Sequence, residues 1–189
     1  MGNKVNTRFF DLIISTIILT ILSPFMIIIF FVCLIESGSP IFIQNRVGKN
    51  QKPFKLFKFR TMKLDTPAMP SHLVNKKSVL KFGAIIRSLK LDELPQLINV
   101  LKGDMSLVGP RPCLFNQKEL RAEREKKNVF SIKPGITGLS QIKGIDMSDP
   151  KRLANSDAFM IKNFNQVNYF KYLISTLYGK GLGDKISKN

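Results

Sequence analysis

The sequence predicts an α+β protein, mostly helical, with an N-terminal re-entrant helix-break-helix membrane segment and a compact cytoplasmic domain that contains a small β-hairpin. Three observations predict this class: a long uncharged run near the N-terminus, two strand-like segments around a turn, and apolar residues at helical spacing further on. The membrane segment is predicted to cover residues 1–36 and the cytoplasmic domain residues 37–189. The chain, 189 residues in all, is long enough for one domain with its own core besides the membrane segment.

The uncharged run covers 24 residues, 12–35. As a helix it would reach about 36 Å, more than the roughly 30 Å of a bilayer's hydrocarbon core. Ser23 and Pro24 lie near its midpoint, where proline removes a helix hydrogen bond and clashes with the preceding turn. The sequence therefore predicts a break at Ser23-Pro24.

Both flanks of the run are basic, whereas a spanning helix normally leaves one flank poor in Lys and Arg. Lys4 and Arg8 precede the run. Between residues 37 and 64, a stretch without acidic residues, lie Arg46, Lys49, Lys52, Lys55, Lys58, Arg60 and Lys63. We therefore expect two legs, each about one leaflet deep, that enter and leave the membrane by its cytoplasmic face. A bent but ordinary transmembrane helix is the alternative.

The composition indicates an anionic partner, because 30 Lys and Arg face 13 Asp and Glu, a net charge of +17. Nucleic acid, anionic lipid and a phosphorylated substrate all fit this charge. Cys33 and Cys113 have neither disulfide nor metal-ligand spacing, which fits a reducing cytosolic setting. The single histidine, His72, lies in a proline-containing loop. The sequence thus excludes His-based catalytic triads and His-rich zinc sites.

Residues 41–43 and 54–60 are predicted to form two short strands, with the turn at 48–51. Lys58 and Arg60 would share one face of the second strand. A basic hairpin that lies on anionic headgroups is the alternative to one that binds a phosphate, and Lys58 is compatible with both uses.

Asp92 and Glu93 are adjacent carboxylates at the start of a segment in which apolar residues recur at helical spacing. We expect them in the first turn of that helix, with Pro95 close to its start. Backbone N–H groups there favour negative charge and keep a carboxylate ionised, as a nucleophile or as a ligand for a hard cation. An acidic pair that only caps a core helix is the alternative.

Two arginines are placed near this pair by the predicted elements. A helix over 81–89 would bring Arg87 just ahead of the pair. Arg111 lies between Pro110 and Pro112, which restrict the backbone on both sides and favour a bidentate phosphate clamp. A surface arginine in a stiff loop is the alternative for Arg111.

The remaining segments are less informative about chemistry. Residues 117–128 form a charged helix with a solvated face, and 164–177 form an amphipathic helix. The loop at 134–138 carries glycines that allow close approach of the backbone to a ligand. Residues 179–184 lack the spacing of a phosphate-binding loop and are interpreted as a tail.

With these motifs placed, the chain resembles the bacterial sugar transferase family, the monotopic polyprenyl-phosphate phosphoglycosyl transferases, in its small single-domain form. The match is ordered and runs almost end to end: FDL at 10–12, SP at 23–24, GSPIF at 38–42, QNRVG at 44–48, KFRTM at 58–62, LDELPQL at 91–97, GDMSLVGPRP at 103–112 and PGITGL at 134–139. Each block alone is weakly specific. Their succession is highly specific.

The resemblance implies transfer of sugar-1-phosphate from a UDP-sugar to polyprenyl phosphate, with release of UMP, as the first membrane step of surface glycan synthesis such as O-antigen or capsule. It places the enzyme at the cytoplasmic face of the bacterial inner membrane, with membrane lipids as partners and no nucleic acid. It implies that Asp92 forms a covalent phosphosugar-aspartyl intermediate and that Glu93 and Asp92 hold the required Mg²⁺. The substrate-binding positions it implies are Lys58, Arg60, Arg87, Pro110, Arg111, Pro112 and Thr137.

The chain departs from the family where many relatives carry Gly-Arg, because here Ile145 follows Gly144. Asp146 and Asp157 lie near acidic positions of some relatives, and the sequence leaves their roles open. Larger relatives carry further transmembrane helices and a domain before this core, so we expect a minimal form here. The sugar, the glycan and the oligomeric state, a homo-oligomer included, are also open.

Two other functions are alternatives to the transferase. One is a basic monotopic membrane-binding protein without chemistry, in which the acidic pair only caps a helix. The other is a membrane-anchored nucleic-acid binder, which the charge favours but which no nucleic-acid motif supports.

Overall fold

The structure is a computed structural model that describes residues 7–66 and 78–179. The predictions that concern Lys4, His72 and residues 180–184 fall outside the described residues. In chain order the helices are α1 (Arg8–Ser37), α2 (Lys81–Ser88), α3 (Gln96–Lys102), α4 (Lys118–Lys126), α5 (Leu139–Ile142), α6 (Pro150–Lys162) and α7 (Gln166–Leu177). The strands are β1 (Ile41–Val47), β2 (Pro53–Phe59), β3 (Ser106–Val108) and β4 (Gly135–Thr137), and the 3₁₀ turns are η1 (Lys49–Gln51), η4 (Leu91–Glu93) and η5 (Val129–Ser131).

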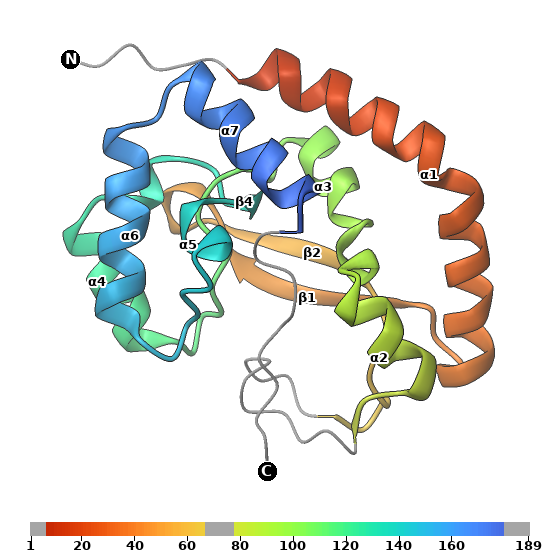
Figure 1. The fold of residues 1–189 in the computed structure, drawn as a ribbon. Coiled ribbons are helices and arrows are strands. Elements are labelled where there is room, and N and C mark those ends of the chain that lie inside the picture. The colour runs from red at the N-terminus through yellow and green to blue at the C-terminus, as the bar shows by residue number, and fades with distance from the viewer. Residues whose placement is uncertain (1–6, 67–77, 180–189) are drawn as a thin grey trace.

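The β1–β2 hairpin lies at the centre of the molecule, between the arch of α1 and the group formed by α4, α5 and α6 (Figure 1). Its strands pair antiparallel, from Ile41 opposite Phe59 to Val47 opposite Pro53. The predicted hairpin is therefore confirmed, with a first strand longer than predicted. β3 and β4 form a separate parallel pair. The mostly helical α+β class is confirmed as well.

The structure corrects the predicted break in the membrane segment, because α1 is one continuous helix through Ser23 and Pro24. Pro24 has no N–H to donate to the Thr20 carbonyl four residues earlier. The Ser23 hydroxyl donates to that carbonyl instead, at 2.9 Å. The helix therefore bends rather than breaks, and Figure 1 shows it arching around the rest of the chain.

By length and composition α1 could cross a membrane. The helix ends at Ser37, one residue beyond the predicted boundary, where Gly38 adopts a left-handed conformation with φ 71°. The re-entrant course of this segment stays a prediction.

The N-terminal end of α1 is bonded to the compact domain through Asp11, a carboxylate that is only 2% exposed. Asp11 accepts hydrogen bonds from the Ser106 hydroxyl at 3.0 Å, the Leu107 N–H at 3.0 Å and the Tyr169 hydroxyl at 2.8 Å. One turn earlier, the Arg8 guanidinium donates to carbonyls at the end of α3. The start of α1 is thereby fixed to α3, β3 and α7.

The C-terminal end of α1 contacts the same domain. Ile29 and Cys33 pack in a buried cluster with Phe59 of β2 and Ile86 of α2. The Glu36 carboxylate accepts a hydrogen bond from the Phe82 N–H at 3.1 Å. Both ends of α1 therefore dock on one folded unit, although 30 residues of helix separate them.

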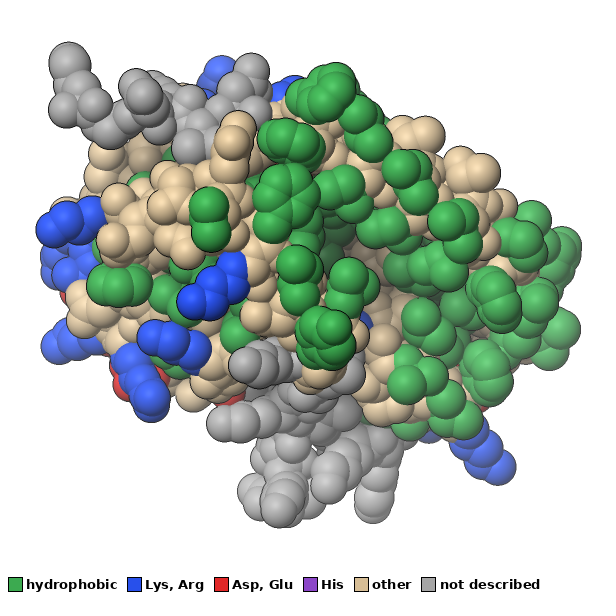
Figure 2. All heavy atoms as spheres, turned by 45° about the horizontal axis from the view of Figure 1, so that its top comes forward, with side chains coloured by type: hydrophobic (Ala, Val, Ile, Leu, Met, Phe, Trp, Pro, Cys, Tyr) green, Lys and Arg blue, Asp and Glu red, His purple; other side chains and the backbone are tan. Residues whose placement is uncertain are grey.

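The outer face of α1 is apolar and exposed. Figure 2 shows hydrophobic side chains gathered over this helix, while several Lys and Arg side chains gather at the opposite edge of the view. The exposed apolar residues of α1 include Phe9, Ile13, Ile17, Ile21, Phe25, Ile27, Ile28, Phe31 and Ile35. Water solvates such a surface poorly, so this face fits the hydrocarbon of a membrane.

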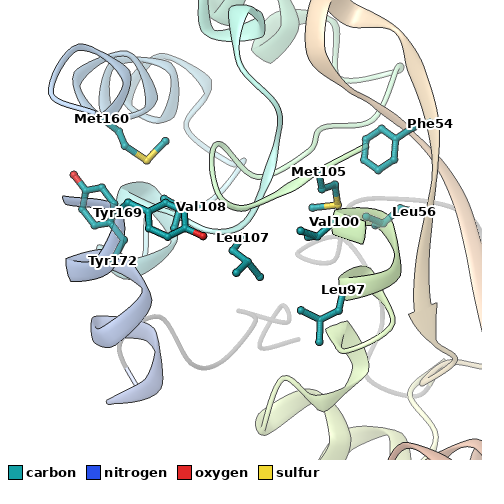
Figure 3. Packing of buried hydrophobic residues seen from close by; sticks show 10 residues of the cluster. All are labelled: Phe54, Leu56, Leu97, Val100, Met105, Leu107, Val108, Met160, Tyr169 and Tyr172. Carbon is teal, nitrogen blue, oxygen red and sulfur yellow. The ribbon is translucent and has the colours of Figure 1, made fainter. Parts of the chain in front are cut away.

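The main core lies between β2, α3, β3 and the two C-terminal helices (Figure 3). Its buried members are Phe54, Leu56, Leu97, Val100, Met105, Leu107, Val108, Met160, Tyr169 and Tyr172. The predicted helices at 81–89, 117–128 and 164–177 are confirmed as α2, α4 and α7. Sequence reasoning missed α6, although Asp149 before Pro150 is a typical helix start and its carboxylate does accept from the Arg152 N–H.

Candidate active site

The two carboxylates lie in η4 rather than in the first turn of an α-helix, which corrects the prediction. Asp92 is 4% exposed and Glu93 6% exposed. The turn is closed by bonds of the tighter i to i+3 type, from Glu93 N–H to the Lys90 carbonyl and from Leu94 N–H to the Leu91 carbonyl. Pro95 has no N–H to extend an α-helix backwards, so α3 begins only at Gln96.

Two cations from distant parts of the chain meet on Glu93. The Lys58 ammonium, near the end of β2, lies 2.7 Å from Glu93 Oε1. The Arg111 guanidinium, from the loop after β3, lies 2.9 Å from the same oxygen. Lys58 is also 3.9 Å from Asp92 Oδ2. The site therefore joins a carboxylate pair with two cations that can hold phosphate oxygens.

The charge state of Glu93 follows from these contacts. Burial of the side chain would by itself raise its pKa. The positive charges of Arg111 and Lys58, together with the Lys58 hydrogen bond, outweigh burial and hold the pKa of Glu93 well below its usual range. Glu93 is therefore an anion at neutral pH.

A recess opens beside these groups. It is lined by Arg46, Leu56, Lys58, Glu93, Gln96, Arg111, Pro112, Gly135 and Ile136. Sequence reasoning named Lys58, Glu93, Arg111 and Pro112 among these and missed Arg46 and Gln96 as site residues. Gln96 could have been found, because it follows Glu93 by three residues and so lies on the same side of a helical segment.

Two other predicted binding residues, Arg60 and Arg87, make contacts outside the recess. The Arg60 guanidinium bonds to the Ser39 carbonyl at 3.0 Å, next to the end of α1. Arg87 is buried at the end of α2, with the Thr61 hydroxyl 3.4 Å from its guanidinium. Neither arginine lines the recess in the described part of the chain.

Thr137 and Pro110 serve the framework of the site. The hydroxyls of Thr137 and Thr176 bond to each other and join β4 to α7. The Pro110 carbonyl accepts from the Gly135 N–H at 2.9 Å. A Cβ on Gly135 would lie 2.0 Å from the Gly109 nitrogen, so the glycine predicted to admit a ligand admits another stretch of backbone instead.

The structure separates the two aspartates whose roles the sequence left open. Asp157 is fully buried in α6, where the Arg124 guanidinium and the Ser140 hydroxyl donate to it. Asp146 accepts from Ser148 in an exposed turn. Ile145 packs against a buried cluster that includes Cys113.

Among residues 7–66 and 78–179, no group of three or more His, Cys, Asp or Glu side chains could hold a metal ion alone. Asp92 and Glu93 nevertheless fit Mg²⁺, because this ion is commonly held by one or two carboxylates together with substrate phosphates. The donor set therefore fits an ion that arrives with a phosphorylated ligand.

Comparison with known proteins places this site in context. A family model described as bacterial sugar transferase matches residues 2–180. Bacillus subtilis EpsL, described as an uncharacterized sugar transferase, is 38% identical over 171 residues, which are 90% of this chain and 84% of the relative. The undecaprenyl-phosphate galactose phosphotransferase of Salmonella typhimurium is 34% identical over 186 residues, 89% of this chain and 39% of the relative.

A third relative is the UDP-glucose:undecaprenyl-phosphate glucose-1-phosphate transferase of Escherichia coli. It is 39% identical over 147 residues, 75% of this chain and 32% of the relative. The chain thus spans two fifths or less of these two longer relatives and most of the length of the Bacillus protein.

Proposed function

The chain belongs to the bacterial sugar transferase family, and on that premise we propose that it transfers sugar-1-phosphate from a UDP-sugar to polyprenyl phosphate. The observation that carries this proposal is the meeting of Lys58 and Arg111 on Glu93, directly beside Asp92. A diphosphate substrate needs such cations, and a covalent transfer needs a carboxylate within their reach. The reaction would be the first membrane step of surface glycan synthesis.

In the first step, a carboxylate oxygen of Asp92 attacks the phosphorus that carries the sugar. The new bond joins Asp92 to the sugar phosphate, and the bond to the bridging oxygen breaks, so that UMP leaves with that oxygen. In the second step, an oxygen of polyprenyl phosphate attacks the same phosphorus. The Asp92 carboxylate is released and polyprenyl diphosphate sugar is formed.

Lys58 and Arg111 have a positioning and electrostatic task in this scheme. They approach Glu93 at 2.7 and 2.9 Å, whereas the Lys58–Asp92 separation is 3.9 Å. Glu93 thus orients the two cations, which line the recess, so that they are placed to bind phosphate oxygens. The position of Asp92 next to Glu93 in this charged cluster supports Asp92 as the nucleophile, with Glu93 as the partner that organises the charges.

Asp92 and Glu93 are the residues that would hold Mg²⁺. When bound, the ion would offset repulsion between the carboxylates and the diphosphate and stabilise charge on the leaving phosphate.

The docking of α1 supports a monotopic arrangement, in which both ends of the helix stay on one side of the membrane. Asp11 near its start and Glu36 near its end both bond to the same compact domain. A helix that crossed the membrane would place these two residues on opposite sides, so one of the two contacts would have to be lost. A bent helix with an apolar outer face can instead dip into one leaflet while both ends stay with the domain.

The reaction is tested with detergent-solubilised protein, a panel of labelled UDP-sugars and Mg²⁺, without lipid acceptor. Intact mass measurement is expected to show a sugar-phosphate adduct on Asp92, together with stoichiometric release of UMP. Addition of polyprenyl phosphate should then discharge the adduct. A chain that binds UDP-sugar but never forms an adduct, even with acceptor present, would argue for a binding protein without this chemistry.

The topology is tested by cysteine accessibility in sealed vesicles, with Cys33 and Cys113 replaced and single cysteines placed near each end of the chain. We expect both ends to react from the cytoplasmic side. Labelling of the two ends from opposite sides would establish a spanning helix.

Pro24→Ala is expected to straighten α1 and shift part of the protein toward a spanning form, because the proline and the Ser23 bond to Thr20 maintain the bend. The same cysteine labelling measures the shift. An unchanged topology would mean that the docking contacts at Asp11 and Glu36 hold the bend without the proline.

Arg111→Ala is expected to raise the KM for UDP-sugar by about ten- to a hundredfold, the usual effect of losing one charge-assisted hydrogen bond. The fold should be retained, with only a moderate fall in melting temperature, because Lys58 still pairs with the buried Glu93 carboxylate at 2.7 Å. Steady-state kinetics and a thermal melt of the same preparation measure the two effects. Wild-type kinetics would remove Arg111 from the substrate site.

A further inference from the structure

The most deeply buried charged pair of the described chain lies outside the recess. Arg124 is 1% exposed and Asp157 is completely buried. The sequence predicted a solvated face for α4, yet Arg124 points inward from that helix. Burial of two charges is costly, so such a pair calls for a specific role.

Each nitrogen of the Arg124 guanidinium and each oxygen of the Asp157 carboxylate has a defined partner. Arg124 Nε and Nη2 donate to Asp157 Oδ2 at 3.0 and 2.7 Å, and the Ser140 hydroxyl donates to Asp157 Oδ1 at 2.7 Å. The remaining branch, Arg124 Nη1, donates to the backbone carbonyl of Arg111 at 2.8 Å. The pair therefore ends on the main chain of a residue whose side chain lies in the proposed active site.

The loop that carries Arg111 is held at every carbonyl from residue 110 to residue 113. Gly135 N–H donates to the Pro110 carbonyl, and Val47 N–H donates to the Cys113 carbonyl. The Arg46 guanidinium donates to the Pro112 carbonyl at 3.2 Å. Arg124 supplies the donor to the remaining carbonyl, that of Arg111.

We propose that Arg124 and Asp157 are positioning residues for Arg111. Asp157 fixes the plane of the Arg124 guanidinium, and Arg124 fixes the Arg111 peptide, so that the Arg111 side chain meets Glu93 and the substrate phosphates in one geometry. The two flanking prolines limit the backbone torsions of the loop, and the Arg124 bond selects one orientation of the peptide within those limits. This inference rests on the proposed function.

Arg124→Lys is the informative substitution, since lysine keeps the charge beside Asp157 but one ammonium cannot reproduce the forked contact with both Asp157 and the Arg111 carbonyl. We expect the KM for UDP-sugar to rise about tenfold. In an Arg111→Ala background the same substitution should change the KM less than twofold, because the side chain being positioned is absent. Equal effects in both backgrounds would reduce Arg124 to a structural residue and overturn the proposal.

Arg121→Lys is the matched control. Arg121 lies one turn earlier on α4 and bonds to Gln51 and to the Phe115 carbonyl, not to the Arg111 loop. Arg121→Lys should leave the KM for UDP-sugar unchanged, both in the wild-type chain and in the Arg111→Ala background. If Arg124→Lys proves too unstable, the double variant Arg124→Met, Asp157→Leu removes both buried charges together. Its KM for UDP-sugar is then compared with and without Arg111→Ala in the same way.

A crystal structure of Arg124→Lys decides the question without any substrate. We expect Arg111 Nη2 to leave Glu93 Oε1, a contact of 2.9 Å in the unmodified chain. An Arg111 side chain that stays in place would overturn the positioning role. If the wild type turns over no UDP-sugar, the proposed function fails, and the crystal structure alone decides the positioning role.

Discussion

Asp92→Asn is expected to abolish sugar-phosphate transfer, with a loss of at least about a thousandfold in kcat, because an amide cannot supply the anionic oxygen that forms the covalent intermediate. Asn has nearly the same shape as Asp, and the 3₁₀ turn that carries Asp92 is closed by backbone hydrogen bonds, which the substitution does not remove. The turn should therefore persist. Binding of UDP-sugar should be retained while the adduct disappears from the intact mass spectrum.

Three measurements test Asp92→Asn: the turnover with acceptor, the mass of the adduct without acceptor, and the affinity for UDP-sugar. Glu93→Gln is the matched comparison, because it neutralises the neighbouring carboxylate that holds Lys58 and Arg111. We expect it to lower the rate of adduct formation while leaving Asp92 as the modified residue. Full activity in Asp92→Asn, or an adduct on another residue, would contradict the assignment of the nucleophile.

Asp11→Ala is expected to produce the largest loss of stability, about 3–5 kcal/mol, because it leaves three donors without their acceptor. In a chain of this size the melting temperature should fall by roughly 10 °C or more. Burial first, and then the charge of Asp11, raise the pKa of Tyr169, so the phenol stays protonated and keeps donating across the neutral range. Thermal unfolding in detergent, followed by circular dichroism, measures the loss.

Two graded variants separate the hydrogen bonds from the packing. Tyr169→Phe removes one of the three donors and leaves the other two satisfied, so we expect a cost of about 1 kcal/mol. Asp11→Asn keeps an acceptor oxygen and should lie between the two. A melting temperature for Asp11→Ala equal to that of Tyr169→Phe would mean that water satisfies the Ser106 and Leu107 donors and that the α1 contact contributes little.

Asp92 and Glu93 illustrate how much of the candidate site the local sequence could predict. The neighbouring acids and the apolar spacing after them placed Asp92 and Glu93 at the start of a helical segment, which is close to the observed turn. The prediction of an α-helical turn at these residues was wrong. Pro95 lacks the N–H that an α-helix would need there, and the i to i+3 bonds that form a 3₁₀ turn instead are visible only in the structure. The sequence predicted Lys58 and Arg111 as phosphate-binding residues, but their meeting on Glu93 could not be predicted locally, since they lie 35 and 18 positions away from it.

The membrane segment illustrates the same limit. The uncharged run and the proline were visible in the sequence, and both exist in α1. The sequence did not show that the Ser23 hydroxyl donates to the Thr20 carbonyl in place of the N–H that Pro24 lacks. The prediction was therefore a break in the helix, whereas the structure has a bend. The anchoring of Asp11 to Tyr169 spans 158 positions, a pairing that no local periodicity encodes.

By itself, then, the sequence determined the features that depend on neighbours in the chain: a long apolar segment, a basic hairpin, an acidic pair and a rigid Pro-Arg-Pro loop. Only the tertiary structure decided which charges meet. It brought Lys58 and Arg111 to Glu93, turned Arg60 toward Ser39, and buried Arg124 against Asp157. The physical reason is that secondary structure follows from short-range sterics and hydrogen bonds, whereas the pairing of buried charges is fixed by how distant elements pack.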